Sequence, residues 1–181
     1  MLILRKYFYN SRRKTMTKDA AMTLSEYLNL VKSNPKLVKT AHQRVYEAII
    51  KKGYKTISAK DDPRLAKILD LKNGDVITVY NLFKNHYGLE REIENIVGYF
   101  RAASLGGESS KLFLFLLGPP GSGKSSIVRT LYWALHNEEI YHIENCPIRE
   151  EPLHALPRAQ RKELEEKHGV VLSEWADLCP V

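Results

Sequence analysis

The run Gly-Pro-Pro-Gly-Ser-Gly-Lys-Ser at residues 118–125 is the part of the sequence whose residue types and spacing point most directly to chemistry. Glycines let a loop turn tightly and bring its backbone N–H groups close to the oxygens of a polyphosphate. In this P-loop pattern the lysine reaches the β- and γ-phosphates, and the next hydroxyl ligates Mg²⁺. The sequence therefore predicts a site for ATP and Mg²⁺ formed by Gly118, Pro119, Pro120, Gly121, Ser122, Gly123, Lys124 and Ser125, with Ser126 supporting the turn.

Two elements must position this loop. Residues 112–117, Leu-Phe-Leu-Phe-Leu-Leu, precede it and predict a buried strand. After Gly123, apolar residues recur at helical spacing on one face, at Ile127, Val128, Leu131, Ala134 and Leu135. A helix beginning here would direct its unsatisfied N–H groups and the positive end of its dipole at the phosphates. Strand, loop and helix in this order favour a nucleotide site over a chance match.

Composition limits the class of protein. A chain of 181 residues can bury one good core, and 44% hydrophobic with 27% charged residues is ordinary for a globular domain. The net charge of +7 is concentrated at the start, because residues 1–18 carry six basic residues and no acidic one. The rest is nearly neutral, so the sequence gives no clear nucleic-acid signal. No apolar stretch is long enough for a membrane span.

Residues 1–22 are interpreted as a basic, disordered extension, with a start at Met16 or Met22 and an organelle presequence as the other readings. Cys146 and Cys179 lack the CxxC spacing of a zinc site, and with His142, His154 and His168 they form no metal pattern. Isolated cysteines favour a reduced, cytoplasmic location.

Residues 23–85 predict a small, mostly helical module. Thr23 and Glu26 have the spacing of a capping box, and a helix restarts at Pro35 and continues to about Ile49. A short helix is expected from Pro63, and a strand at 76–80.

Residues 86–181 predict the nucleotide-binding domain. An amphipathic helix spans 88–100, a flexible connection 105–110 leads to the loop, and a second strand follows at 140–143. A polar helix is expected from Pro157 to His168, ended by Gly169, and 170–172 suggests another short strand.

Several segments together resemble the PrkA-type serine protein kinases, which carry an AAA+ domain. The resemblance covers roughly residues 24–180. It rests on Tyr27-Leu28, Asn34-Pro35, 40–46 (Thr-Ala-His-Gln-Arg-Val-Tyr), 61–65 (Asp-Asp-Pro-Arg-Leu), 87–90 (Tyr-Gly-Leu-Glu), 96–101 (Ile-Val-Gly-Tyr-Phe-Arg), 118–126, Cys146-Pro147-Ile148, 151–154 (Glu-Pro-Leu-His) and 178–180 (Leu-Cys-Pro).

The resemblance implies an α/β fold: a P-loop NTPase, AAA+-like, with an incomplete parallel sheet core preceded by the helical module. It also implies that residues 118–126 bind ATP and Mg²⁺, that Tyr87 and Gly88 lie beside the adenine, and that the longer family proteins phosphorylate serine or threonine in protein substrates. No hhhhDE strand is found, since 170–174 matches poorly and Glu144 lies too close to the loop. No arginine finger can be assigned either. The sequence is therefore interpreted as an amino-terminal fragment, or as one piece of a split gene, that hydrolyses ATP poorly, if at all, alone.

Two other functions stay open at this point. A small-molecule P-loop kinase would need a lid with clustered arginines, and Arg149, Arg158 and Arg161 are scattered. In a nucleotide-stabilised interaction module, the helical region would dock a partner instead. The partners expected beside the nucleotide are a protein substrate, a second copy of the chain, and a separate carboxy-terminal portion.

Overall fold

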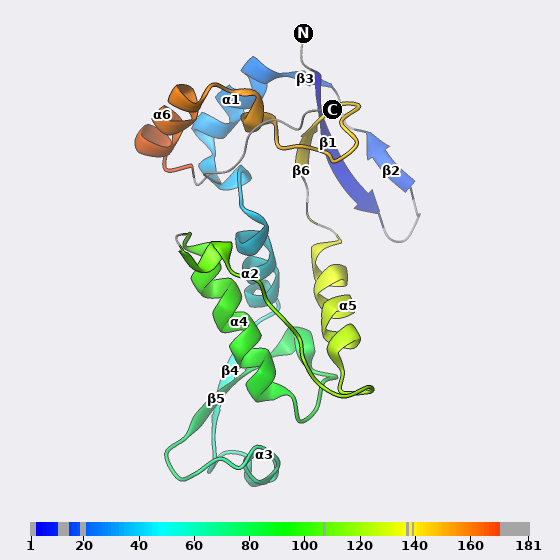
Figure 1. Cartoon of the computed structure of the whole chain (residues 1–181), viewed down its shortest axis with the longest axis vertical. Coiled ribbons are helices and arrows are strands. Elements are labelled where there is room, and N and C mark those ends of the chain that lie inside the picture. Colours follow the sequence, from blue (N-terminus) through cyan, green and yellow to red (C-terminus); the bar gives the residue numbers. More distant parts are fainter. Residues whose placement is uncertain are drawn as a thin grey trace. The chain divides into compact units, whose positions relative to one another are not determined.

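The computed structural model describes residues 3–10, 15–18, 21–106, 108–136, 138 and 140–170. The chain divides into two compact units, unit 1 (Met1–Thr40 with His136–Val181) and unit 2 (Ala41–Leu135). Figure 1 shows the elements of both. This division differs from the expected segments 1–22, 23–85 and 86–181. The expected helical module contributes to both units, because its first helix packs in the apolar cluster of unit 1 and its residues from Ala41 onward belong to unit 2.

Unit 1 is built on a small antiparallel sheet. Strand β1 (Ile3–Asn10) pairs with β2 (Thr15–Lys18), β3 (Met22–Thr23) and β6 (Ile140–Ile143). Residues 3–10 and 15–18 fall within the extension 1–22 that was expected to be disordered, but they form β1 and β2. Ile3 and the aromatic residues of β1 are of the types that strands favour. The strand predicted at 140–143 is formed, and its partner is β1. Residues 171–172 of the other short strand lie outside the described residues.

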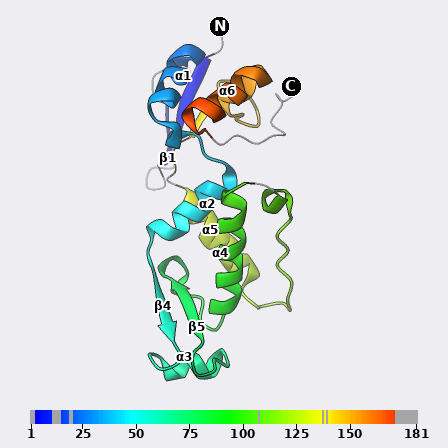
Figure 2. The same cartoon turned by 90° about the vertical axis from the view of Figure 1, so that its left-hand side faces the viewer.

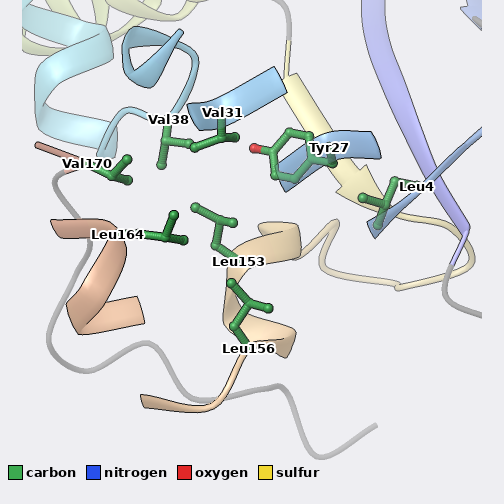
Figure 3. Packing of buried hydrophobic residues seen from close by; sticks show 8 residues of the cluster. All are labelled: Leu4, Tyr27, Val31, Val38, Leu153, Leu156, Leu164 and Val170. Atoms are coloured by element: carbon green, nitrogen blue, oxygen red, sulfur yellow. The ribbon is translucent and has the colours of Figure 1, made fainter. Parts of the chain in front are cut away.

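The helices of unit 1 close over a shared apolar cluster. They are α1 (Leu24–Ser33), α6 (Arg158–His168) and 3-10 turns at Pro35–Leu37 and Pro152–Ala155. Figure 3 shows how the side chains of the cluster point toward one another, and its members are Leu4, Tyr27, Val31, Val38, Leu153, Leu156, Leu164 and Val170. The cluster brings Tyr27 and Leu153 of the 151–154 motif into one core, although the two residues are far apart in sequence. Tyr27 also donates a hydrogen bond from its hydroxyl to Glu151 Oε1 at 2.6 Å.

The predicted helix ends in unit 1 have their expected chemistry. The Thr23 hydroxyl accepts from the Glu26 N–H, and Glu26 accepts in return from the Thr23 N–H, so the capping box is confirmed. Helix α6 ends at Gly169, which adopts the left-handed conformation, and the Lys167 ammonium lies 2.7 Å from Glu163. The helix predicted from Pro35 is interrupted. Val38 is extended and packs in the cluster of unit 1.

Unit 2 holds the loop. Its elements are α2 (Ala41–Lys51), β4 (Tyr54–Ser58), α3 (Pro63–Ile68), β5 (Val76–Tyr80), α4 (Glu90–Ser104) and α5 (Lys124–Leu135), with 3-10 turns at Asn81–Phe83 and Glu108–Lys111. Figure 2 shows α2 and α4 side by side, with the β4–β5 hairpin extending beyond them. One core joins the helices, made of Ile49, Phe83, Ile93, Ile96, Val97 and Ile127.

Helix α3 and strand β5 were predicted, and both are formed. The Asp62 side chain accepts hydrogen bonds from the Arg64 and Leu65 N–H groups, so it caps α3 as Asp-Pro spacing suggests. Strand β4 was not predicted. It begins directly after Gly53, and only Ile57 of its five residues is buried, so it lacks the alternation of apolar and polar residues that marks a strand.

The buried strand expected at 112–117 is not formed. Figure 1 draws this stretch as a plain coil, and its side chains are largely exposed, at 88% for Phe113 and 90% for Leu117. A strand satisfies its backbone only by pairing with a neighbour. In the described part of unit 2 the two strands, β4 and β5, pair antiparallel with each other. The described residues therefore form a mixed α/β structure with small antiparallel sheets, in place of the expected parallel core.

Candidate functional site

The loop at 118–123 curls around the ammonium group of Lys124. Lys124 Nζ donates to the carbonyl oxygens of Gly118 at 2.7 Å and Pro119 at 2.6 Å, and to Ser122 Oγ at 3.0 Å. The Ser122 N–H closes the turn by donating to the Pro119 carbonyl at 3.3 Å. The positive charge thus lies inside the concave side of the loop. A positive charge in this position can attract a polyanion.

Two glycines give the loop its shape. Gly121 and Gly123 have φ of +80° and +86°, in the left-handed region that side chains disfavour. At Gly123 a Cβ would also lie 2.8 Å from Leu89 Cδ1, so the Leu89 side chain would have to shift. Leu89 in turn packs against the core of unit 2. The end of the loop is therefore fixed against the segment that precedes α4.

Helix α5 begins at Lys124, as predicted, and presents its first turn to the loop. Ser125 and Ser126 are exposed at this end. The Ile127 N–H donates to the Gly123 carbonyl at 2.9 Å, and the Ile127 side chain is buried in the core. The first N–H groups of a helix lack partners within the helix and carry partial positive charge. The core therefore fixes the direction in which these donors point.

The residues expected beside the adenine lie next to the same turn. Tyr87 is 83% exposed, and Gly88 adopts a positive φ of +74°. The preceding residue, His86, lies with its Nε2 atom 3.0 Å from Ser126 Oγ, in a hydrogen bond. The structure thus brings the 86–89 segment and the loop together. The sequence analysis assigned no role to His86, and its place directly before Tyr87 was the signal available.

The residues considered for a metal do not gather in the described residues. Within them, no group of three or more His, Cys, Asp or Glu side chains could hold a metal ion. His154 Nδ1 lies 3.1 Å from Glu150 Oε1, and Cys146 is a free thiol. Glu144, which was judged too close to the loop in sequence to be the acid of an hhhhDE strand, belongs to unit 1, where its N–H donates to the Ile3 carbonyl. Cys179 and the 171–174 part of the weak hhhhDE match lie outside the described residues.

None of the helices in the described ranges is long and apolar enough to cross a lipid bilayer.

The chain is similar to known proteins along most of its length. The model of the PrkA AAA domain matches residues 22–181. The ATP-dependent protease PrkA of Bacillus subtilis (strain 168) is 30% identical over 156 residues, which cover 82% of this chain and 22% of that protein. The serine/threonine kinase YeaG of Escherichia coli (strain K12) is 30% identical over 177 residues, covering 91% and 27%.

A shorter similarity extends to another group. Lon protease of Desulfosudis oleivorans is 39% identical over 72 residues, which are 40% of this chain and 8% of that protein. No solved structure matches the chain.

These similarities define the class as an AAA domain, a kind of P-loop NTPase. The chain belongs to the PrkA AAA domain family. It spans about a quarter of the length of the PrkA and YeaG relatives, or 22% and 27%.

Proposed function

We propose that this chain binds ATP with Mg²⁺ as the AAA region of a PrkA-like protein. The observation that carries the proposal is the loop at 118–123, curled around the Lys124 ammonium at the first turn of α5. Both PrkA and YeaG are named for activities that use a nucleoside triphosphate, which favours the same conclusion.

Each residue of the site has a role in this proposal. Backbone groups of the loop surround the phosphates. They belong to Gly118, Pro119, Pro120, Gly121, Ser122 and Gly123. Lys124 exchanges its neutral carbonyl partners for phosphate oxygens, so that both the donor and the acceptor of the contact carry charge. Ser125 ligates Mg²⁺, which neutralises charge on the phosphates. Ser126 supports the turn, and Tyr87 with Gly88 contacts the adenine.

Slow turnover by the chain alone is part of the proposal. Phosphoryl transfer needs a group that orients the nucleophile, in addition to Lys and Mg²⁺. In the described part of unit 2, no cluster of metal-ligating side chains accompanies the loop. We propose that residues 112–117 become a strand of a parallel sheet when further polypeptide of a PrkA-like protein supplies neighbouring strands. That polypeptide would also bring the missing acid.

The reaction of such an assembled protein is proposed to be phosphoryl transfer to serine or threonine of a protein substrate, as the name of the YeaG relative suggests. The PrkA relative is named as a protease, so peptide hydrolysis is the competing activity. Incubation of an assembled protein with casein and γ-labelled ATP separates the two. Labelled casein supports the kinase, whereas unlabelled cleavage products support the protease. The expected cytoplasmic location stays a prediction.

The nucleotide proposal is tested by the thermal midpoint of the full chain with and without ATP–Mg²⁺. A ligand at 100 times its Kd stabilises the folded state by about 2.7 kcal/mol, so a clear upward shift is expected. Lys124→Ala should lose most of this shift. Lys55→Ala, an exposed lysine change on β4 in the same unit, should retain it.

Equal shifts for Lys124→Ala and the unchanged chain would contradict the proposal, as would no shift for the unchanged chain at millimolar ATP–Mg²⁺. Rapid ATP hydrolysis by the purified chain would contradict only the part that concerns turnover.

A further inference from the structure

His86 connects two parts of the site that are proposed to bind different parts of a nucleotide. On one side it precedes Tyr87 and Gly88, the residues proposed to contact the base. On the other, its Nε2 atom is hydrogen-bonded to Ser126 Oγ, in the first turn of α5, at 3.0 Å. The two residues are separated by 40 positions, so this bond is a tertiary contact and does not follow from local chain geometry.

The His86 ring is held from the core side. It packs edge-on against Phe83, with 5.7 Å between ring centroids, and Phe83 is 3% exposed. The His86 N–H donates to the Phe83 carbonyl at 2.8 Å, which fixes the backbone at the same place. The second ring nitrogen, Nδ1, is enclosed by protein and has no hydrogen-bond partner among the described residues. The ring therefore has one polar contact there, and it is the one to Ser126.

A second contact, between Leu89 and Gly123, also joins the 86–89 segment to the loop. Leu89 lies so close to Gly123 that a Cβ there would be 2.8 Å from Leu89 Cδ1. The 86–89 segment thus meets the loop at its end through an apolar contact and meets α5 through a polar one. Tyr87 and Gly88 lie between these two contacts, and Tyr87 remains 83% exposed. Two contacts on either side of an exposed aromatic residue fix its backbone and leave its ring accessible.

We propose that His86 is a positioning residue that, through Ser126, holds the base-side segment 86–89 in place beside the phosphate loop. The inference rests on the proposed nucleotide binding. The phosphate loop has its own supports, because Ser122 closes its turn and Ile127 anchors α5 in the core. Loss of the His86–Ser126 bond therefore loosens the base side and leaves the phosphate side formed.

The bond is tested with His86→Ala, Ser126→Ala and the double variant in the full chain, by calorimetric titration with ATP–Mg²⁺. Each single change should weaken binding about 2- to 10-fold, the range expected for one net hydrogen bond. The double variant should be no weaker than the weaker single one, because the same bond is lost once. His42→Ala is the matched control, since His42 also contacts a hydroxyl in unit 2, with Nε2 3.3 Å from Tyr99 Oη.

Conservative variants distinguish positioning from a general loss of structure. The side-chain amide nitrogen of glutamine can occupy the place of histidine Nε2, whereas that of asparagine corresponds to Nδ1. His86→Gln should therefore restore much of the affinity, and His86→Asn should not. Inorganic triphosphate with Mg²⁺, used as a competitor, should bind the His86→Ala and unchanged chains with affinities within about 2-fold of each other.

Three results would overturn the inference: unchanged ATP affinity in His86→Ala, additive losses in the double variant, or equal weakening of ATP and triphosphate. Failure of the unchanged chain to bind ATP–Mg²⁺ would instead overturn the proposed function itself, and the two failures are therefore distinguishable.

Discussion

Residues 112–117 lead into the glycine-rich loop and helix α5 leads out of it, and the apolar residues of the two segments have different surroundings. In α5, Ile127 is 4% exposed and packs in the core of unit 2. In 112–117, Phe113 and Phe115 are exposed, while Leu116 packs partly against that core. A helix satisfies its backbone hydrogen bonds within itself, so it can form against a single apolar surface. A strand needs a second strand beside it to pair its backbone N–H and C=O groups before it can be buried.

The comparison explains how the loop keeps its curled form without a strand before it. The contacts that shape it come from its own residues, from the first turn of α5 and from Leu89. The alternation in 112–117 nevertheless suits a strand, because Leu114 and Leu116 are less exposed than Phe113, Phe115 and Leu117. Leu116 on one face packs against the core, whereas Phe113, Phe115 and Leu117 on the other face are exposed.

Ile127→Ala gives the largest expected effect. Removing a buried isoleucine side chain costs about 2–5 kcal/mol of unfolding free energy, because the transfer energy is lost and a cavity remains. Urea unfolding followed by circular dichroism measures the loss. The neighbouring Val128→Ala is the control, since Val128 is 54% exposed and should change the value by roughly 0.5 kcal/mol or less. Equal effects would show that α5 does not support the loop through its core face.

The sequence predicted the elements that make their own hydrogen bonds better than those that need partners. Helices α1, α3, α4, α5 and α6 follow from apolar spacing and caps, of which Thr23 with Glu26 and Asp62 are the clearest. The predicted strand at 112–117 was wrong for this structure. Six consecutive apolar residues indicate a preference for a buried strand, but they do not show whether a neighbouring strand is present to pair with it. The pairing of β6 with β1 joins the two ends of the chain, which no local pattern indicates.

At the site, the loop residues could be predicted from the sequence because their types and spacing suit phosphate binding. The structure has brought Lys124 into the loop and the Tyr87 segment beside α5, but which of these residues contact a nucleotide stays a prediction. His86 was not predicted to take part, since its role depends on a hydroxyl 40 residues away. The contact between Leu89 and Gly123 was equally beyond the sequence, because it depends on how closely the two segments approach.

Gly123→Ala should have the next largest effect. A non-glycine residue at a positive φ costs of order 1–3 kcal/mol, and here the Leu89 side chain must also move. Because the strain falls within the loop, both the unfolding free energy and the affinity for ATP–Mg²⁺ should decrease. These are measured by urea unfolding and calorimetric titration.

Gly98→Ala is the matched control for this change. Gly98 is exposed in α4, and a Cβ there meets no atom within 4 Å. The same substitution should stabilise unit 2 by about 0.5–1 kcal/mol, because alanine favours the helix over glycine. Opposite changes in unfolding free energy for Gly123→Ala and Gly98→Ala would show that the loop requires the positive φ of Gly123. A neutral Gly123→Ala change would mean that the loop does not depend on this backbone conformation.

Phe113→Lys combined with Phe115→Lys has the smallest expected effect and separates the two segments most sharply. Both rings are exposed, so replacing them should change the unfolding free energy by only about 0.5 kcal/mol or less, and ATP–Mg²⁺ affinity should stay unchanged. The change should reduce self-association at high protein concentration, measured by light scattering, because exposed apolar patches favour association between molecules. A loss of several kcal/mol would instead mean that these rings are buried in solution. The segment would then already have a partner, such as a second copy of the chain, and the contrast with α5 would no longer hold.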